Sequence, residues 1–256
     1  MSERKRVADF WDGVLADWRG DQTMRDLPEL LRIWRKSYKG EIDLLGYPEG
    51  FIGDLRGEKK EPRLVVLGLN PGVAHHELQG PEGEWTRVIR RLSYSRSLQE
   101  RTPFQNPAWR KYHGKDSRYW VNLVRFAKRW LGDQAGLTDV LNFEMFPFHS
   151  KNLKHAITPP SDIIEAFVWS PLKEMETDTI FAFGRDWVSV CDKLLGQPLA
   201  CFGRNALFLG DETNGNWQVR IYPLEHKRVV VSWQNGYAGP PSRNVEELRR
   251  VLHETA

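Results

Sequence analysis

The spacing of apolar residues divides the chain into a helical start and a longer region of alternating elements. In residues 7–18, apolar side chains recur at i, i+3, i+4, i+7, i+8 and i+11, which predicts a helix with one apolar face. A second helix is predicted after Asp26, a helix-capping residue type, with Pro28 in its first turn. Residues 46–57 are rich in glycine and proline and are expected to form a loop. We therefore expect residues 1–60 to be a helical extension packed on a main domain of residues 61–256.

After residue 60, short apolar runs alternate with helical patterns. Continuous apolar runs predict strands buried on both faces, and these runs cover residues 64–69, 137–146, 179–183 and 227–233. Helical spacing predicts helices over residues 85–92, 116–130, 161–168, from 184 onward, and 244–252. Strands separated by helices require parallel crossovers. The pattern therefore predicts an α/β fold, a three-layer α/β/α sandwich with a central, mainly parallel four-stranded sheet.

In a parallel sheet, the functional site lies beyond the carboxyl ends of the strands. The segments expected there are residues 70–85, 142–152 and 234–243. The first of them begins with Gly68-Leu69-Asn70-Pro71-Gly72, in which a tight Asn-Pro-Gly turn holds one amide side chain at the mouth of the sheet. The same tripeptide is also an ordinary turn sequence, so its position after a buried strand is what makes it a candidate.

Composition excludes several classes of protein. The chain has 256 residues, 40% of them hydrophobic and 28% charged, which is typical of a globular domain. It contains no apolar run long enough for a membrane span and no apolar signal core, so a cytoplasmic location without membrane contact is expected. The two cysteines, Cys191 and Cys201, are expected to be reduced, buried thiols. His75 and His76 have no clustered carboxylates or cysteines nearby, and no phosphate-binding glycine motif is present, so we expect no metal and no cofactor.

Charge is distributed unevenly along the chain. Residues 85–130, called the basic segment below, contain 12 lysines and arginines but only two acidic residues, Glu100 and Asp116. The segment is therefore +10, while the whole chain is +3 and the remainder is −7. Nine aromatic residues are interleaved with these cations, most of them expected in the core. This pattern predicts a polyanionic partner, with contacts to phosphates from Arg87, Arg90, Arg91 and Lys111.

The strand and loop around Asn70 resemble the first motif of the uracil-DNA glycosylase superfamily. The resemblance is greatest to the mismatch-specific and single-strand-selective branches, in which this motif reads Gly-x-Asn-Pro-Gly. Further pieces follow in order over residues 64–245: a helix at residues 85–89, Asn142 at a strand end, a strand with a glycine exit at 181–185, and Pro241-Ser242-Arg243-Asn244 after the last strand.

The resemblance implies a DNA glycosylase that flips a uracil or modified pyrimidine out of DNA and hydrolyses its N-glycosidic bond. It implies that Asn70 positions the attacking water and that Asn142 reads the base edge. Ser242 is implied to grip a phosphate and Arg243 to fill the gap in the base stack. The remaining pocket residues expected on this basis are Gly68, Leu69, Pro71, Gly72, Phe143 and Phe148. DNA is the expected partner of a monomeric protein.

The sequence also departs from the superfamily's pattern. The histidine of the second motif, which stabilises charge on the leaving base, is missing because Gly239 and Pro240 precede Pro241. His149 is the candidate to replace it. Glu82 lies in a stretch where relatives carry an aromatic ring that stacks on uracil, and a carboxylate there favours exocyclic amines or hydroxyls. The target is therefore expected to be a modified pyrimidine, such as a glucosylated hydroxymethylcytosine of phage DNA.

Other interpretations stay open. Asn142 and His149 are alternatively ordinary strand-end and loop residues, and Glu82 is alternatively a solvated carboxylate. A DNA-binding or damage-sensing module without catalysis would keep the fold and explain the missing histidine. A hydrolase or transferase acting on free nucleosides would use the same crevice, although the basic segment argues against it.

Overall fold

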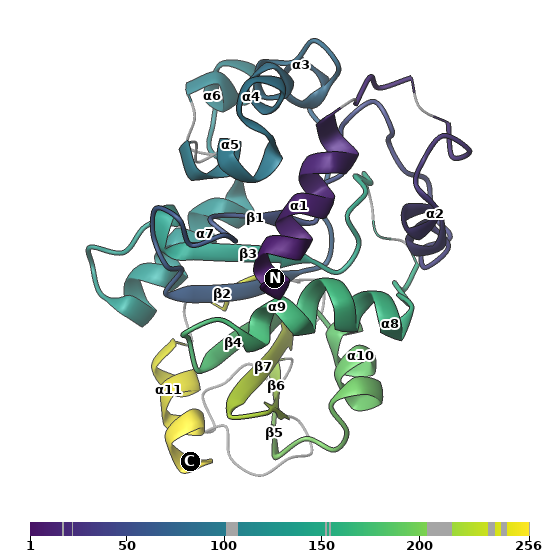
Figure 1. Ribbon diagram of the computed structural model, residues 1–256. Coiled ribbons are helices and arrows are strands. Elements are labelled where there is room, and N and C mark those ends of the chain that lie inside the picture. The colour runs from purple at the N-terminus through teal and green to yellow at the C-terminus, as the bar shows by residue number, and fades with distance from the viewer. Residues whose placement is uncertain are drawn as a thin grey trace.

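The computed structural model describes residues 1–16, 18–21, 23–100, 107–151, 153, 155–203, 217–234, 239–241 and 245–255. Within these ranges the chain forms an α/β fold around one mixed sheet of seven strands, in the order β1-β3-β2-β4-β7-β6-β5 (Figure 1). The strands are β1 (Phe51–Ile52), β2 (Leu64–Gly68), β3 (Val140–Glu144), β4 (Thr179–Phe183), β5 (Ala200–Phe202), β6 (Trp217–Leu224) and β7 (Lys227–Gln234).

The centre of the sheet consists of the strands predicted from apolar runs. β3, β2, β4 and β7 pair in parallel, and every residue of β2 and β3 is buried. The prediction of a four-stranded sheet was too small, since β1, β6 and β5 extend it by antiparallel pairing. β1 and β5 are too short to show a periodic pattern. Burial alternates along most of β6, as is typical of a strand with one buried face, although the sequence prediction did not include this strand.

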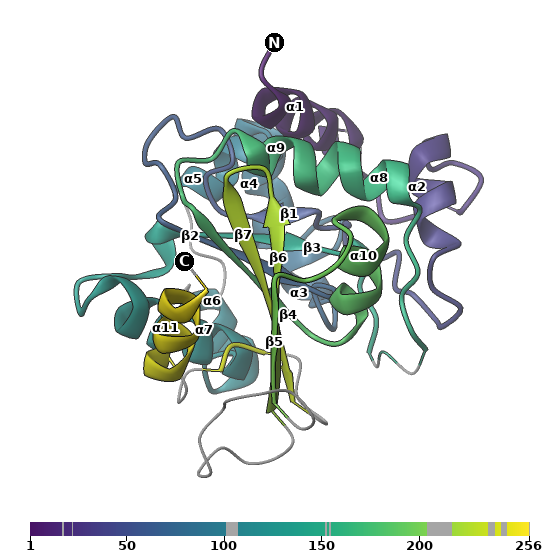
Figure 2. The ribbon, with the colours of Figure 1, turned by 90° about the horizontal axis from the view of Figure 1, so that it is seen from below.

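Helices lie on both sides of the strands. In Figure 2, α7 and α11 lie on one side of β4, β7 and β6, and α10 lies on the other. The described helices are α1 (Glu3–Ala16), α2 (Glu29–Arg35), α3 (His76–Gln79), α4 (Glu84–Leu92), α5 (Tyr94–Glu100), α6 (Pro107–His113), α7 (Arg118–Leu131), α8 (Ser161–Ile164), α9 (Ser170–Lys173), α10 (Asp186–Leu194) and α11 (Val245–Glu254). A π-helical turn over Glu165–Trp169 joins α8 to α9.

Several local expectations are corrected by the structure. The expected strand over residues 137–146 begins with a 3-10 turn (Leu137–Asp139), and only Val140–Glu144 is extended. The loop expected at residues 46–57 contains β1, which pairs with β3. Cys191 is buried as expected, but Cys201 is exposed because it lies on β5, at the edge of the sheet.

The first sixty residues pack closely against the rest of the chain. α1 contacts α5 and α9, and its buried side chains belong to the same hydrophobic core as the sheet. Trp11 of α1 lies 6.1 Å from Trp34 and 6.5 Å from Tyr94, between ring centroids. The placement of a domain boundary at residue 60 stays a prediction. Of the helices in the described part of the chain, none is both long and apolar enough to cross a membrane.

Candidate functional site

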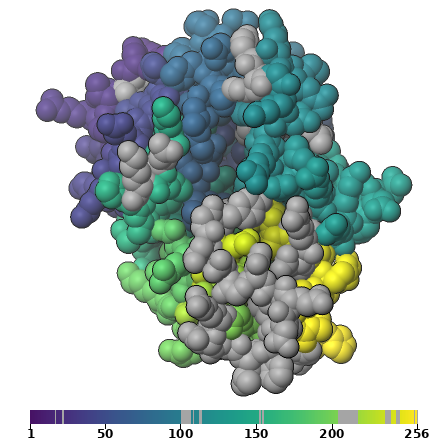
Figure 3. All heavy atoms as spheres, turned by 180° about the vertical axis from the view of Figure 1, so that it is seen from behind, coloured from purple at the N-terminus to yellow at the C-terminus, as the bar shows by residue number. Residues whose placement is uncertain are grey.

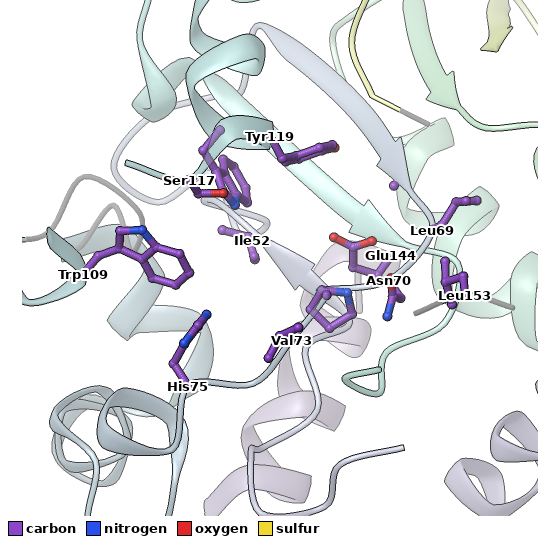
Figure 4. Close-up of a pocket in the computed structure, with 14 residues that line it drawn as sticks. Ile52, Leu69, Asn70, Val73, His75, Trp109, Ser117, Tyr119, Glu144 and Leu153 are labelled. Atoms are coloured by element: carbon purple, nitrogen blue, oxygen red, sulfur yellow. The ribbon is translucent and has the colours of Figure 1, made fainter. Parts of the chain in front are cut away.

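A cavity of about 400 Å³ opens at the carboxyl ends of β2 and β3 (Figure 4). We call it the strand-end cavity. Its wall combines the β2 exit, the end of β3, and residues from α6 and the start of α7. It is lined by Ile52, Gly68, Leu69, Asn70, Pro71, Gly72, Val73, His75, Trp109, Ser117, Tyr119, Trp120, Glu144 and Leu153.

The Asn-Pro-Gly loop, residues 70–72, forms one side of the strand-end cavity. Gly72 has a φ of +79°, a left-handed conformation that glycine adopts without strain, and this turns the chain sharply after Pro71. The amide nitrogen Nδ2 of Asn70 is buried and has no hydrogen-bond partner among the described residues. An amide left in this way is available to a ligand or water in the cavity.

Asn142 and Glu144 point to the same face of β3 because side chains alternate along a strand. The Nδ2 group of Asn142 donates to Oε1 of Glu144 at 2.6 Å. The hydroxyl of Tyr119, on α7, donates to Oδ1 of Asn142 at 3.0 Å. Of these residues, Glu144 and Tyr119 line the strand-end cavity, and Asn142 connects them from behind. Asn142, which was expected to read the base, thus links Tyr119 and Glu144 by hydrogen bonds. We call these three side chains the polar chain.

Glu144 is held mainly in its protonated, neutral form near pH 7. Burial, with a smaller contribution from the negative charge of Glu49, raises the pKa of Glu144 to about 8, and the hydrogen bond from Asn142 opposes the shift. Since Oε1 accepts from Asn142, the proton belongs on Oε2, which has no partner among the described residues. Gly68 is the register partner of Glu144 on β2, and a Cβ at Gly68 would lie 2.5 Å from that Oε2. Glycine therefore leaves the space that the carboxyl group occupies.

His149 lies behind the Asn-Pro-Gly loop and is not part of the described lining of the strand-end cavity. Its ring is 1% exposed, and burial lowers its pKa to about 4, so it is neutral at pH 7. Its Nδ1 lies 3.2 Å from the carbonyl oxygen of Gly72, and its Nε2 lies 3.1 Å from the carbonyl oxygen of Tyr47 and 3.3 Å from the side-chain amide of Gln79. The N–H of Ser150 also donates to the carbonyl of Gly72, at 2.9 Å. This geometry holds the loop in place and keeps His149 away from a ligand.

Aromatic rings from the basic segment form the opposite wall. Trp109, Tyr119 and Trp120 all line the strand-end cavity. His75 packs edge-on against Trp109, with ring centroids 4.4 Å apart, and Trp85 of α4 stacks on the same indole from behind. Residues 64–100 and 107–131 lie side by side on the face shown in Figure 3. The basic segment is therefore part of the cavity as well as a charged surface.

The cations expected to contact phosphates lie on the surface. Arg87, Arg90 and Arg91 are exposed on α4 and Lys111 on α6. Arg90 makes protein contacts, to the carbonyl of Trp18 and to the carboxylate of Glu82. All eleven described lysines and arginines of the basic segment are exposed.

Other predicted site residues lie away from the cavity. The side chain of Glu82 is 83% exposed and does not belong to the described lining. Phe143 faces the opposite side of β3 and packs on Phe51, and Phe148 packs on Phe146, so both are core residues. Ser242 and Arg243 lie outside the described residues.

Sequence reasoning missed Glu144, and it assigned Tyr119 and Trp109 only to a general aromatic group. The signal for Glu144 was present, because Asn142-x-Glu144 places two polar side chains on one face at the end of an apolar strand. No signal linked Trp109 to the strand-end cavity, since its packing against His75 arises only in the tertiary structure. Among the described residues, no group of three or more His, Cys, Asp or Glu side chains is arranged to hold a metal ion.

The chain was compared with known proteins. No protein-family model matches it, and no curated protein matches it significantly.

Proposed function

We propose that this protein is a DNA glycosylase that receives an extruded uracil or modified pyrimidine in the strand-end cavity and hydrolyses its N-glycosidic bond. One observation carries the proposal. The amide of Asn70, the polar chain ending at Glu144, and the rings of Trp109, Tyr119 and Trp120 surround one cavity at the carboxyl ends of parallel strands. An enzyme that acts on a flipped base needs a pocket that fits a planar aromatic ring, polar groups that bind the edge of the base, and a group that positions water.

The sheet supports the resemblance to the uracil-DNA glycosylase superfamily. We take the four parallel strands β3, β2, β4 and β7, with helices on both sides, as the counterpart of that superfamily's three-layer core. In the proposed reaction Asn70 orients a water toward the anomeric carbon, while the exposed cations of α4 and α6 contact the DNA backbone. His149 acts through the loop, by fixing Gly72, and we propose it as a positioning residue.

A pyrimidine with a large 5-substituent is favoured over plain uracil by the size of the cavity. The cavity extends beyond the Asn70–Glu144 region to His75, Trp109 and Ser117, a surface of rings and a hydroxyl of the kind that binds polar substituents. Excision of hypermodified cytosines of phage DNA, as a defence activity, is therefore our second candidate. A non-catalytic DNA-binding module would use the same surface without base release.

Base release tests the proposal directly. Purified protein is incubated with oligonucleotides that carry uracil, 5-hydroxymethyluracil, 5-hydroxymethylcytosine or its glucosylated form. Alkali treatment then detects abasic sites, and mass spectrometry detects the free base. We expect release from at least one substrate, and Asn70→Ala is expected to lower the rate by ~10²-fold or more while DNA binding is kept. Salt-sensitive binding without base release from any substrate would favour the non-catalytic module.

A further inference from the structure

The hydrogen bonds of the polar chain beside the strand-end cavity all run in one direction. Tyr119 donates to Asn142, and Asn142 donates to Oε1 of Glu144. Both acceptor atoms are therefore engaged, and the carboxyl group ends the chain with Oε2. A buried glutamate with a purely structural role is expected to have both oxygens bonded, yet Oε2 is buried and has no partner among the described residues.

The surroundings of Glu144 keep its proton in place. The titratable groups around Glu144 are Glu49, ahead of β1, which interacts with it electrostatically, and Tyr119, on α7, which is bonded to Asn142, while His75 lines the same cavity and His149 lies behind the loop. Neither Tyr119 nor the neutral ring of His149 supplies a positive charge at pH 7 that would stabilise the ionised carboxylate, and Glu49 opposes ionisation. The absence of a side chain at Gly68 leaves room for the carboxyl group beside the β2 exit.

We infer that Glu144 is the general acid of the reaction and takes the place of the missing histidine of the second motif. This inference rests on the proposed function. In this role, the proton on Oε2 of Glu144 is donated to a carbonyl oxygen of the flipped pyrimidine, where negative charge accumulates as the base departs.

The proton balance of the step is complete. The oxygen of water bonds to the anomeric carbon, the bond from that carbon to the ring nitrogen breaks, and its electron pair stays with the base. The proton on Oε2 moves to the carbonyl oxygen, so that the base leaves neutral, and the proton lost by water passes to solvent. A proton from solvent then restores the carboxyl group of Glu144.

The experiment measures single-turnover base release between pH 6 and 9.5 with the four oligonucleotides named above, for wild-type protein and Glu144→Gln. Glutamine keeps the volume and accepts from Asn142, but it cannot transfer a proton. We expect the wild-type rate to fall as pH rises through about 8. The variant is expected to be ~10²-fold slower at pH 7, with no alkaline fall. Tyr119→Phe is the matched control, because it removes the head of the polar chain and leaves the transferable proton; a few-fold loss with the alkaline fall retained is expected.

The outcomes separate the two proposals. Base release by wild-type protein with a rate that does not change between pH 6 and 9.5 would overturn the role of Glu144 and leave the glycosylase activity standing. This holds even if Glu144→Gln fails to fold, because it needs no variant. A folded Glu144→Gln protein with the wild-type rate and profile would overturn it as well. The absence of release from all four substrates would overturn both proposals.

Discussion

At the scale of single residues, the site depends on groups behind the Asn-Pro-Gly loop as well as on the residues that line the strand-end cavity. The carbonyl oxygen of Gly72 accepts from the backbone N–H of Ser150 and lies 3.2 Å from Nδ1 of His149, and these contacts fix the loop that presents Asn70. His149 performs this role as a neutral ring, because burial lowers its pKa to about 4. The burial that places His149 against the loop therefore also keeps its ring neutral.

The stability of the protein is expected to depend on His149 in acid. Its folded pKa, about 4, lies below the ordinary value of 6.5, so the unfolded chain binds the extra proton first. The contribution is present above pH 6.5 and is lost as pH falls toward 4, by about 3 kcal/mol in the free energy of unfolding. In His149→Gln this part of the acid dependence should disappear, as urea unfolding at pH 7 and 4.5 would measure. His253→Gln, at an exposed position on α11, is the control and should follow the wild type. Equal acid dependence of His149→Gln and wild type would contradict the prediction.

At the scale of elements, α4, α6 and α7 of the basic segment both build the aromatic wall of the strand-end cavity and present exposed cations. α4 and α6 contact each other through the stacked pair of Trp85 and Trp109, with ring centroids 6.3 Å apart. Trp109 continues to the cavity wall, and the start of α7 adds Tyr119 and Trp120. The outward faces of the same helices present exposed cations. Under the proposed function, we expect DNA that contacts these cations to pass beside the strand-end cavity.

Charge reversal on α4 should weaken DNA binding. Arg87 and Arg91 are four residues apart and exposed, so Arg87→Glu with Arg91→Glu is expected to lower affinity for duplex DNA. The slope of log affinity against log salt should fall in magnitude by ~0.9 for each phosphate that the protein no longer neutralises. Fluorescence anisotropy at several salt concentrations measures both quantities. Arg32→Glu with Lys36→Glu is the matched control at α2, which lies apart from α6 and α7 in Figures 1 and 2 and should change the slope little. An equal effect of the two double variants would contradict a specific role for α4.

At the scale of the whole molecule, the N-terminal residues and the sheet share one core. β1 pairs with β3 opposite Asn142 and Phe143, so a strand from the first sixty residues supports the strand that supplies the site. α1 is held by Trp11, which is 1% exposed. A Cβ at Gly50 would lie 2.2 Å from this indole, so the loop ahead of β1 runs directly against it.

Loss of the Trp11 side chain is expected to destabilise the entire protein. Trp11→Ala should reduce the free energy of unfolding by about 3–5 kcal/mol, because truncation leaves a cavity between α1, Trp34 and Tyr94. Leu45→Ala, at an apolar side chain that is 49% exposed, is the control and should cost less than about 0.5 kcal/mol. Chemical unfolding monitored by fluorescence and by circular dichroism measures both variants. If α1 were a loosely attached extension, Trp11→Ala would leave the main transition unchanged.

The sequence by itself determined the local features of this protein. It determined the four central strands, most of the helices, and the position of Asn70 in a tight turn after a buried strand, because each of these depends on neighbouring residues. Tertiary structure decided which distant groups meet. It paired β1 with β3, placed His149 behind Gly72 instead of in the cavity, and brought Tyr119 and Glu144 together through Asn142. Burial also set the protonation of Glu144, since desolvation depends on the packing of the whole chain around it and leaves no trace in local sequence.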